Sequence, residues 1–245
     1  MQIKKFYGYY KIQAPSTFVT TETLSDYNDK KEVTVAPNIT ILSRDTRSAV
    51  VNVLFANHYT NNVTDVKILG RIPFEGNSYV NGIDLHSTFT TKMKSNGIEL
   101  PSDLEEHARI YYSNVENTTQ DLEDENNNWK LAEDITSFDD IKTYLIVIDS
   151  DAIIRGKQYK FSYEIEIPED TEYNEIAYSC HTAYFNLMTN GGLLEMSIQP
   201  NKLGFRIAKF YDLDVVKLKE STELPIQGAM YKLSHDEEDN IINKF

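Results

Sequence analysis

The sequence predicts an all-β fold in which two antiparallel sheets pack into a sandwich, and three observations support this prediction. The 245 residues include 16 Tyr and 11 Phe but a single Trp, and such an aromatic content favours strands over helices. About a dozen short segments are separated by turn residues at the spacing typical of sandwiches. Only one short helical turn is indicated. The length allows one large domain together with pieces of its neighbours.

The clearest strand covers Tyr159–Pro168. Aromatic and aliphatic side chains occupy every second position from Tyr159 to Ile167, and polar side chains occupy the positions between them. Because side chains alternate across a strand, this pattern predicts one buried and one solvated face. Pro168 has no N–H to donate and ends the strand. We expect the chain to turn and to pair with a second alternating segment, Ile176–Phe185, at the centre of a sheet.

The first third of the chain is expected to contain an N-terminal region and the first strands. Residues 1–32 combine an aromatic strand, Phe6–Ile12, with a polar linker, Thr20–Lys31, and are interpreted as the tail of a preceding module. The apolar run Ala49–Ala56 and the segment Val63–Ile72 flank an Asn-rich turn, which predicts a hairpin. The other strands expected here are Glu32–Ala36, Ile39–Ser43, Ser87–Met93 and Ala108–Tyr112.

A long polar loop is expected over residues 114–133, where Asn, Asp, Glu and Thr dominate. Ser137–Asp140 has the spacing of a capping box, and Ile141 follows at helical spacing, so a short helical turn should precede the strand Thr143–Ile148. Asn190–Gly192 predicts a hairpin turn. The remaining expected strands are Leu193–Ile198, Leu203–Lys209, Leu213–Lys219 and Ala229–Leu233. Together these segments predict an antiparallel, immunoglobulin-like sandwich.

Composition and charge exclude several classes of protein. The formal charge of −14 argues against a nucleic-acid partner, because binding phosphates requires a basic patch. The single Cys180 can form neither an internal disulfide nor a cysteine-based metal motif. No apolar run reaches 18 residues, so we expect no membrane span. The N-terminus lacks the apolar region of a signal peptide, so we expect either an intracellular protein or a fragment of a longer one.

Few residues qualify as candidates for chemistry, and no cofactor is expected. Asp121, Asp124 and Asn126 lie in an acidic loop that could offer oxygen ligands to Ca²⁺, but the loop lacks the EF-hand register, and a solvated loop without metal is the favoured interpretation. Cys180 and His181 are neighbours on a strand and point to opposite sides, so they should not form a nucleophile and base pair. Cys180 is expected in the core. The five histidines show no metal-binding spacing and are expected to be packed or exposed separately.

Two stretches resemble modules of Gram-positive cell-surface proteins. Ala49–Pro73 resembles the repeated sandwich domain of long bacterial surface stalks, and this resemblance continues to Ala208. Leu213–Lys219 and the following Leu224–Leu233, with its Pro-Ile-x-Gly-Ala-x-Tyr-x-Leu run, resemble the opening hairpin of the collagen-adhesin B-type module of pilins and adhesins. The resemblances imply a stalk domain over residues 33–209 and the start of a truncated module over residues 210–245.

The B-type family joins a lysine of its first strand to an asparagine of its last strand through an isopeptide bond, assisted by an acidic residue. Lys217 occupies the matching position, and the resemblance implies that its partner lies beyond Phe245. The implied function is a non-catalytic stalk region of a secreted, cell-wall-anchored, adhesin- or pilin-like protein. The implied partners are neighbouring modules of the same polypeptide, with host protein or carbohydrate as further candidates.

Two other classes of function remain open. The first is a ligand-binding β-sandwich, for carbohydrate or host protein, that uses the loops of residues 87–128. The second is a sandwich-type hydrolase with two close carboxylates, since any two of the 38 acidic residues could meet in space. An exposed aromatic cluster near the loops would favour binding, whereas a uniformly polar surface would favour the stalk.

Overall fold

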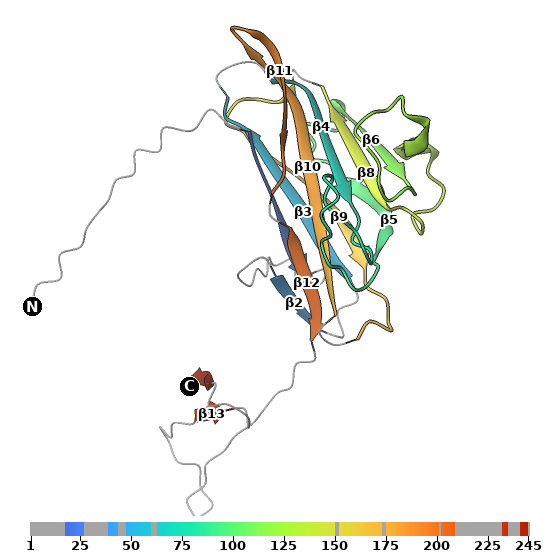
Figure 1. Cartoon of the computed structure of the whole chain (residues 1–245), viewed down its shortest axis with the longest axis vertical. Helices are drawn as coiled ribbons and strands as arrows, with labels where there is room; N and C mark the ends of the chain where they lie inside the picture. The colour runs from blue at the N-terminus through green and yellow to red at the C-terminus, as the bar shows by residue number, and fades with distance from the viewer. Residues whose placement is uncertain are drawn as a thin grey trace, which may run out of the picture. The chain divides into compact units, whose positions relative to one another are not determined.

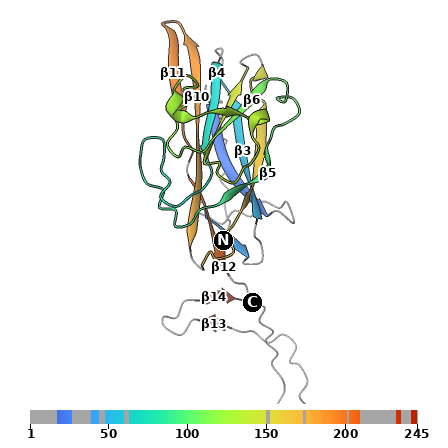
Figure 2. The same cartoon turned by 90° about the vertical axis from the view of Figure 1, so that its right-hand side faces the viewer.

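The computed structural model describes residues 18–26, 39–43, 48–59, 63–149, 152–172, 175–200, 202–208, 232–234 and 241–244 (Figures 1 and 2). The chain divides into two compact units, residues 1–209 and residues 210–245. The strands of the first unit are β1 (Phe18–Asp26), β2 (Ile39–Ser43), β3 (Ser48–Asn57), β4 (Val63–Arg71), β5 (Lys92–Glu99), β6 (Ala108–Ser113), β7 (Lys130–Leu131), β8 (Thr143–Ile148), β9 (Gln158–Glu166), β10 (Ile176–Thr189), β11 (Gly192–Ile198) and β12 (Leu203–Ala208). The second unit contains β13 (Lys232–Ser234) and β14 (Ile241–Lys244), which pair with each other.

The first unit is a sandwich of two sheets, which confirms the predicted fold class. One sheet has four strands in the order β1-β3-β9-β5, and the other has eight strands in the order β2-β12-β10-β4-β8-β6-β7, with β11 paired to the last part of β10. In Figure 1 the two sheets form two layers, with β10, β4 and β8 in front of β3 and β9. Every described pair in the unit is antiparallel except β2 and β12, which run parallel.

The core lies between the two sheets and is built from alternate residues of the strands. On β9, Tyr159, Phe161, Tyr163 and Ile165 are each at most 1% exposed, which confirms the predicted alternation. Tyr144 of β8 meets this row from the opposite sheet, and its ring packs edge-on against Phe161. Aromatic side chains thus fill much of the space between the layers.

Two predicted pairings are wrong. β9 pairs with β3 and β5 in the four-stranded sheet, whereas β10 pairs with β4, β11 and β12 in the other sheet. Likewise β3 and β4 belong to different sheets and do not form a hairpin. In both cases the chain crosses from one layer to the other. Each strand can bury its apolar face only against a second layer, and alternation alone does not specify which strand lies beside it.

The N-terminal region also differs from expectation. Residues Thr20–Asp26 were expected in a linker, but they belong to β1, which pairs with β3 over its whole length, with Thr20 opposite Phe55. Among the other expected strands, Phe6–Ile12, Glu32–Ala36 and Leu213–Lys219 lie outside the described residues.

Two further segments take a different local structure. Residues 72–91, where a strand was expected from Ser87, form a long connection that packs on β10, with the Tyr178 N–H donating to Ser87 Oγ, and β5 begins only at Lys92. At the expected helical turn, Ser137 Oγ accepts from the Asp139 N–H at 3.2 Å and makes a local turn instead. The short helical turns are the 3₁₀ segments η1 (Glu125–Asn127) and η2 (Ala132–Asp134).

The first and last strands of the sandwich start and finish at opposite ends of it. β1 begins with Phe18 opposite Asn57, at the end where β9 starts. β12 finishes at the other end, where Arg206 pairs with Ile176, the first residue of β10. Figure 1 shows β12 reaching the bottom of the sandwich. No helix in the described part of the chain is long and apolar enough to span a membrane.

Candidate functional site

A group of polar side chains is buried between the two sheets where β1 faces β10. Thr20 and Glu22 are two residues apart on β1, so both point to the inner face. Each is 8% exposed, and the Glu22 carboxyl group itself is fully covered. His181 of β10 lies opposite them and is 1% exposed. We call Thr20, Glu22 and His181 the cross-sheet network.

The hydrogen bonds of the network are consistent with a protonated His181 that faces an ionised Glu22. His181 Nδ1 lies 2.6 Å from Glu22 Oε1, and His181 Nε2 contacts Thr20 Oγ1. The Thr20 hydroxyl donates to the Leu54 carbonyl oxygen at 3.1 Å, which leaves its oxygen free to accept. All three contacts are therefore satisfied when both ring nitrogens donate, as in an imidazolium that faces a carboxylate. The network is then a buried ion pair extended by one hydroxyl.

Two tyrosines and a serine surround this pair. Tyr163 Oη lies 3.1 Å from Ser179 Oγ, and the Tyr144 and Tyr163 rings have centroids 5.3 Å apart. Burial raises the pKa of both tyrosines well above 10, with the Glu22 charge adding to the effect. Both hydroxyls therefore stay neutral. Among the described residues, Glu22 Oε2 and the Tyr144 hydroxyl have no hydrogen-bond partner.

Gly70 is part of the same arrangement because it makes room for Tyr144. The two residues are paired on β4 and β8, and the phenol ring lies over the glycine. A Cβ at position 70 would stand 2.0 Å from Tyr144 Cζ, which no packing tolerates. The small residue thus allows the aromatic ring to reach the middle of the sandwich.

The chemistry available to this network is structural. All three side chains are closed off from solvent, so no external substrate reaches the Thr20 hydroxyl. The network joins β1, which pairs with β3 alone among the described strands of its sheet, to the central strand β10 of the other sheet. Separating the charges inside the protein is unfavourable, because each would remain buried without its partner.

The sequence missed Thr20 and Glu22, whereas Cys180 is buried, as expected. His181 and Cys180 do point to opposite sides of β10, but it is His181 that faces the core. Cys180 is buried on the outer face, with Sγ 3.9 Å from the Ser78 carbonyl oxygen. Burial, with a further contribution from Glu22, raises the pKa of this thiol to about 12, so it is not a nucleophile.

The proposed calcium residues take part in local loop structure. Asp121 accepts the Glu123 N–H at 2.9 Å, and Asp124 accepts the backbone and side-chain N–H groups of Asn126. No group of three or more His, Cys, Asp or Glu side chains in the described ranges is arranged to hold a metal ion. The calcium site stays a prediction. Lys217, the isopeptide candidate, lies outside the described residues.

Comparisons with known proteins give weak similarities of structure alone. No family model and no curated protein matches the chain. The major pilin subunit BcpA of Bacillus cereus, in its D312A form, has a TM-score of 0.38 and 6% identity over 89% of this chain and 48% of its own, so this chain spans about half of that pilin. The seventh ScaB type I cohesin of Pseudobacteroides cellulosolvens has a TM-score of 0.39 and 7% identity, covering 73% of this chain and 92% of its own. The full-length major pilin SpaD of Corynebacterium diphtheriae has a TM-score of 0.32 and 8% identity, covering 76% and 34%. At these values none of them assigns a role to the chain.

Proposed function

We propose that this chain is a non-catalytic stalk region of a secreted, wall-anchored bacterial surface protein, and that its sandwich transmits tension between the modules on either side. The observation that carries the proposal is the position of the terminal strands. β1 begins at one end of the sandwich and β12 finishes at the opposite end, so a pull on the chain acts along the strands. Interstrand hydrogen bonds, which run across the strands, are then loaded together.

The cross-sheet network supports this proposal because it strengthens the strand that receives the load. In the part of the sheet that the structure describes, β1 is an edge strand and β3 is its only partner. Without further contacts, tension applied at Phe18 would act on a single ladder. The ion pair of Glu22 with His181 adds a second attachment, to β10, the strand that also pairs with β12.

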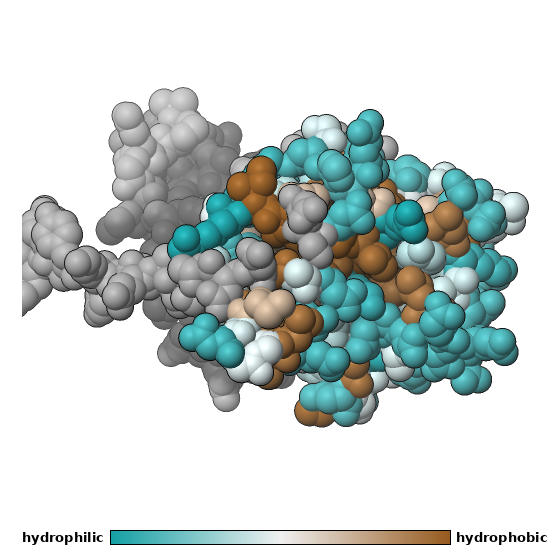
Figure 3. Space-filling view, turned by 90° about the horizontal axis from the view of Figure 1, so that it is seen from above, coloured by the Kyte–Doolittle hydropathy of each residue, from teal (hydrophilic) through white to brown (hydrophobic). Residues whose placement is uncertain are grey.

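The end at which β1 begins also offers apolar surface for a neighbouring module. Met188, Leu193 and Leu194, beside the turn between β10 and β11, are 45%, 57% and 49% exposed. Figure 3 views the sandwich from this end and shows hydrophobic surface among hydrophilic side chains. In a serial arrangement this end faces the preceding module, which would cover part of that surface.

Single-molecule force measurements test the proposal. The full chain is held by its two termini and stretched, and the unfolding force of the sandwich is compared with that of a second geometry, in which the chain is held by its N-terminus and a Gly191→Cys variant. Position 191 tolerates a side chain, since its Cβ would meet only Thr189 Oγ1 at 3.8 Å. Both attachment points then lie at the same end of the sandwich, so the interstrand hydrogen bonds break one after another.

We expect a clearly higher unfolding force for the end-to-end geometry. The mechanical role would be refuted if the unfolding forces were equal in the two geometries. It would also be refuted if end-to-end unfolding required forces only as low as those of helical proteins. The isopeptide role of Lys217 is a separate part of the proposal. It predicts that a longer protein, extended past Phe245, loses one ammonia from its intact mass and that Lys217→Ala abolishes this loss.

A further inference from the structure

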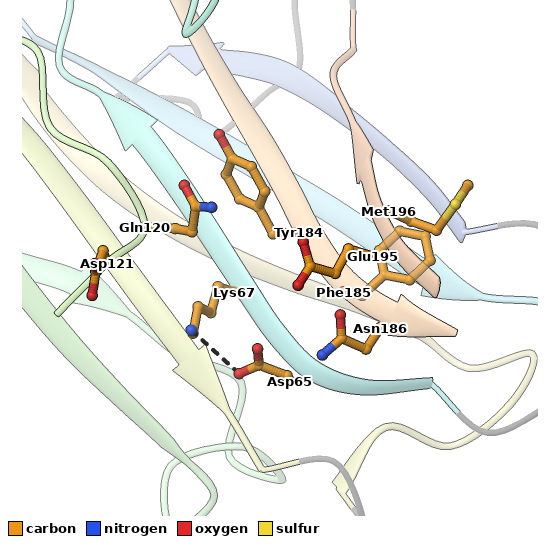
Figure 4. A pocket seen from close by; sticks show the side chains of 9 residues that line it. All are labelled: Asp65, Lys67, Gln120, Asp121, Tyr184, Phe185, Asn186, Glu195 and Met196. Carbon is orange, nitrogen blue, oxygen red and sulfur yellow. Dashed lines mark ion pairs between the residues drawn. The ribbon is translucent and has the colours of Figure 1, made fainter. Parts of the chain in front are cut away.

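A hollow of about 280 Å³ lies on the outer face of the eight-stranded sheet (Figure 4). Its floor is formed where β4, β10 and β11 run side by side, and the loop that follows β6 closes one flank. Figure 4 shows that the lining side chains come from these different elements, with the Lys67 ammonium group directed toward Asp65. We call it the outer-face hollow. It is separate from the cross-sheet network, which lies on the inner face.

β4 has a bulge beside the hollow. Lys67 pairs with Tyr184 and Thr64 pairs with Asn186, so two residues of β4, Asp65 and Val66, stand opposite a single residue of β10. Asp65 adopts a left-handed φ of 51°. Asp65 and Lys67 share the outer face, as residues two apart on a strand do, and Val66 between them faces inward with 0% exposure. Bulges are common beside functional sites, and a residue strained in this way costs about 1–3 kcal/mol.

The lining combines charged groups, amide groups, the aromatic residues Tyr184 and Phe185, and Met196. Lys67 Nζ lies 3.3 Å from Asp65 Oδ1, and the carboxylates of Asp121 and Glu195 add negative charge that exceeds the single ammonium group. Burial raises the pKa of Tyr184, so its hydroxyl remains a neutral donor and acceptor. The side-chain amides of Gln120 and Asn186 can donate and accept as well.

We propose that the outer-face hollow binds a saccharide, either uncharged or carrying an amino group. Sugar hydroxyls donate and accept at the same time, which matches a lining of amides, carboxylates and a phenol. An aromatic ring face such as that of Tyr184 can pack against the C–H face of a sugar ring. The hollow is smaller than the clefts that enclose drug-sized ligands, which suits one or two sugar units of a longer chain.

Other ligand classes fit this hollow less well. A peptide that adds a strand needs a free sheet edge, but β10 at Asn186 is already paired with β4 on one side and with β11 on the other. The excess of negative charge disfavours nucleic acid and acidic sugars. The inference does not depend on the stalk function, since a load-bearing sandwich can carry a binding site on its outer face.

The binding test uses the full chain and three defined trisaccharides. Amide chemical shifts are followed by NMR while a β-1,4-linked glucosamine trimer, a cellotriose or a galacturonic acid trimer is added. We expect saturable shifts in β4, β10 and β11 with the first two sugars, tighter binding of the amino sugar, and none of these shifts with the acidic sugar. Absence of binding by both the amino and the neutral sugar at millimolar concentrations would overturn the proposal.

Four variants show whether binding occurs at the hollow. Tyr184→Ala should weaken binding of both sugars by about tenfold, as loss of one aromatic contact predicts. Glu195→Gln and Asp65→Asn should weaken the amino sugar several-fold and leave cellotriose unchanged. Both changes preserve shape, and Asn accepts a left-handed φ, so the fold is retained. Tyr178→Ala is the matched control, because it lies on the same face of β10 but outside the hollow.

The control and the isosteric variants decide the outcome. If the glucosamine trimer binds equally well to Glu195→Gln, Asp65→Asn and Tyr184→Ala, binding occurs elsewhere and the assignment is wrong. If Tyr178→Ala weakens binding as much as Tyr184→Ala does, the effect reflects general destabilisation and the hollow is likewise excluded.

Discussion

Removal of the His181 side chain should destabilise the sandwich far more than its size suggests. In a His181→Leu variant, the Glu22 carboxyl loses the nitrogen that lies 2.6 Å from Oε1, while Oε2 already has no partner among the described residues. The carboxyl group is fully covered, so water cannot replace the lost partner. A buried charge without compensation costs about 3–5 kcal/mol when one member of the pair is removed.

A double-mutant cycle separates this effect from simple loss of packing. The Glu22→Leu/His181→Leu double variant removes both polar groups together, and replacement of a buried ion pair by apolar side chains is often close to neutral. We therefore expect the double variant to be more stable than His181→Leu alone by about 2 kcal/mol or more. The free energy of unfolding is measured by urea titration at pH 7, followed by tyrosine fluorescence and circular dichroism.

The control is Asp103→Asn, which breaks the exposed ion pair with Lys157. The side chains of Asp103 and Lys157 are 38% and 42% exposed, so the variant is expected to cause no measurable change in the urea midpoint of unfolding. Two results would refute the view that the network is a buried and coupled ion pair. The first is a loss of less than about 1 kcal/mol in the free energy of unfolding of His181→Leu. The second is a double variant whose loss of stability equals the sum of the losses of the two single variants.

Three further outcomes follow from the surroundings of the network. Gly70→Ala should cost about 3 kcal/mol in urea unfolding, and should cost much less in a Tyr144→Leu background, because the clash is with that ring; equal costs in both backgrounds would contradict the contact. Native Cys180 should resist iodoacetamide at pH 8.5 and react after unfolding, as its burial requires; rapid native labelling would contradict this. Stability should fall as pH rises above about 9. The pKa of Cys180 is 9.0 when the thiol is exposed but about 12 in the folded protein, so between these values only the unfolded thiol ionises. The free energy of unfolding should then fall by about 1.4 kcal/mol per pH unit. Tyr112, whose pKa is also raised to about 12, adds to this loss from pH 10, and Cys180→Ala should reduce the slope above pH 9.

The sequence identified most of the strands because their local pattern is strong. In β9, four alternate apolar residues, followed by Ile167 just beyond the strand, leave little choice about which face is buried, and the structure agrees. The partners of β9 could not be predicted in the same way. Pairing with β3 and β5 depends on which sheet each strand joins, and this is decided by packing between residues that are distant in sequence.

The candidate site was hidden for two reasons. Thr20 and Glu22 are polar, so β1 was taken for a linker, and only the His181 ring across the sandwich explains why such residues can face inward. Around Cys180 both faces of β10 are buried, because residues 72–91 cover the outer one there. Hydrophobicity therefore could not distinguish the face of Cys180 from that of His181, although strand geometry correctly placed them on opposite sides.

The parallel pairing of β2 with β12 has a consequence for the order of folding. Among the described strands, β2 is the second, yet its only partner in the eight-stranded sheet is β12, the last strand of the sandwich. During synthesis β2 must wait until β12 has left the ribosome, and the edge of the sheet stays open until then. Closing so long a loop is slow, because its entropy is lost before any contact is gained. Completion of this edge is therefore expected to be a late step of folding, during which the unfinished edge is the surface that a chaperone would have to protect.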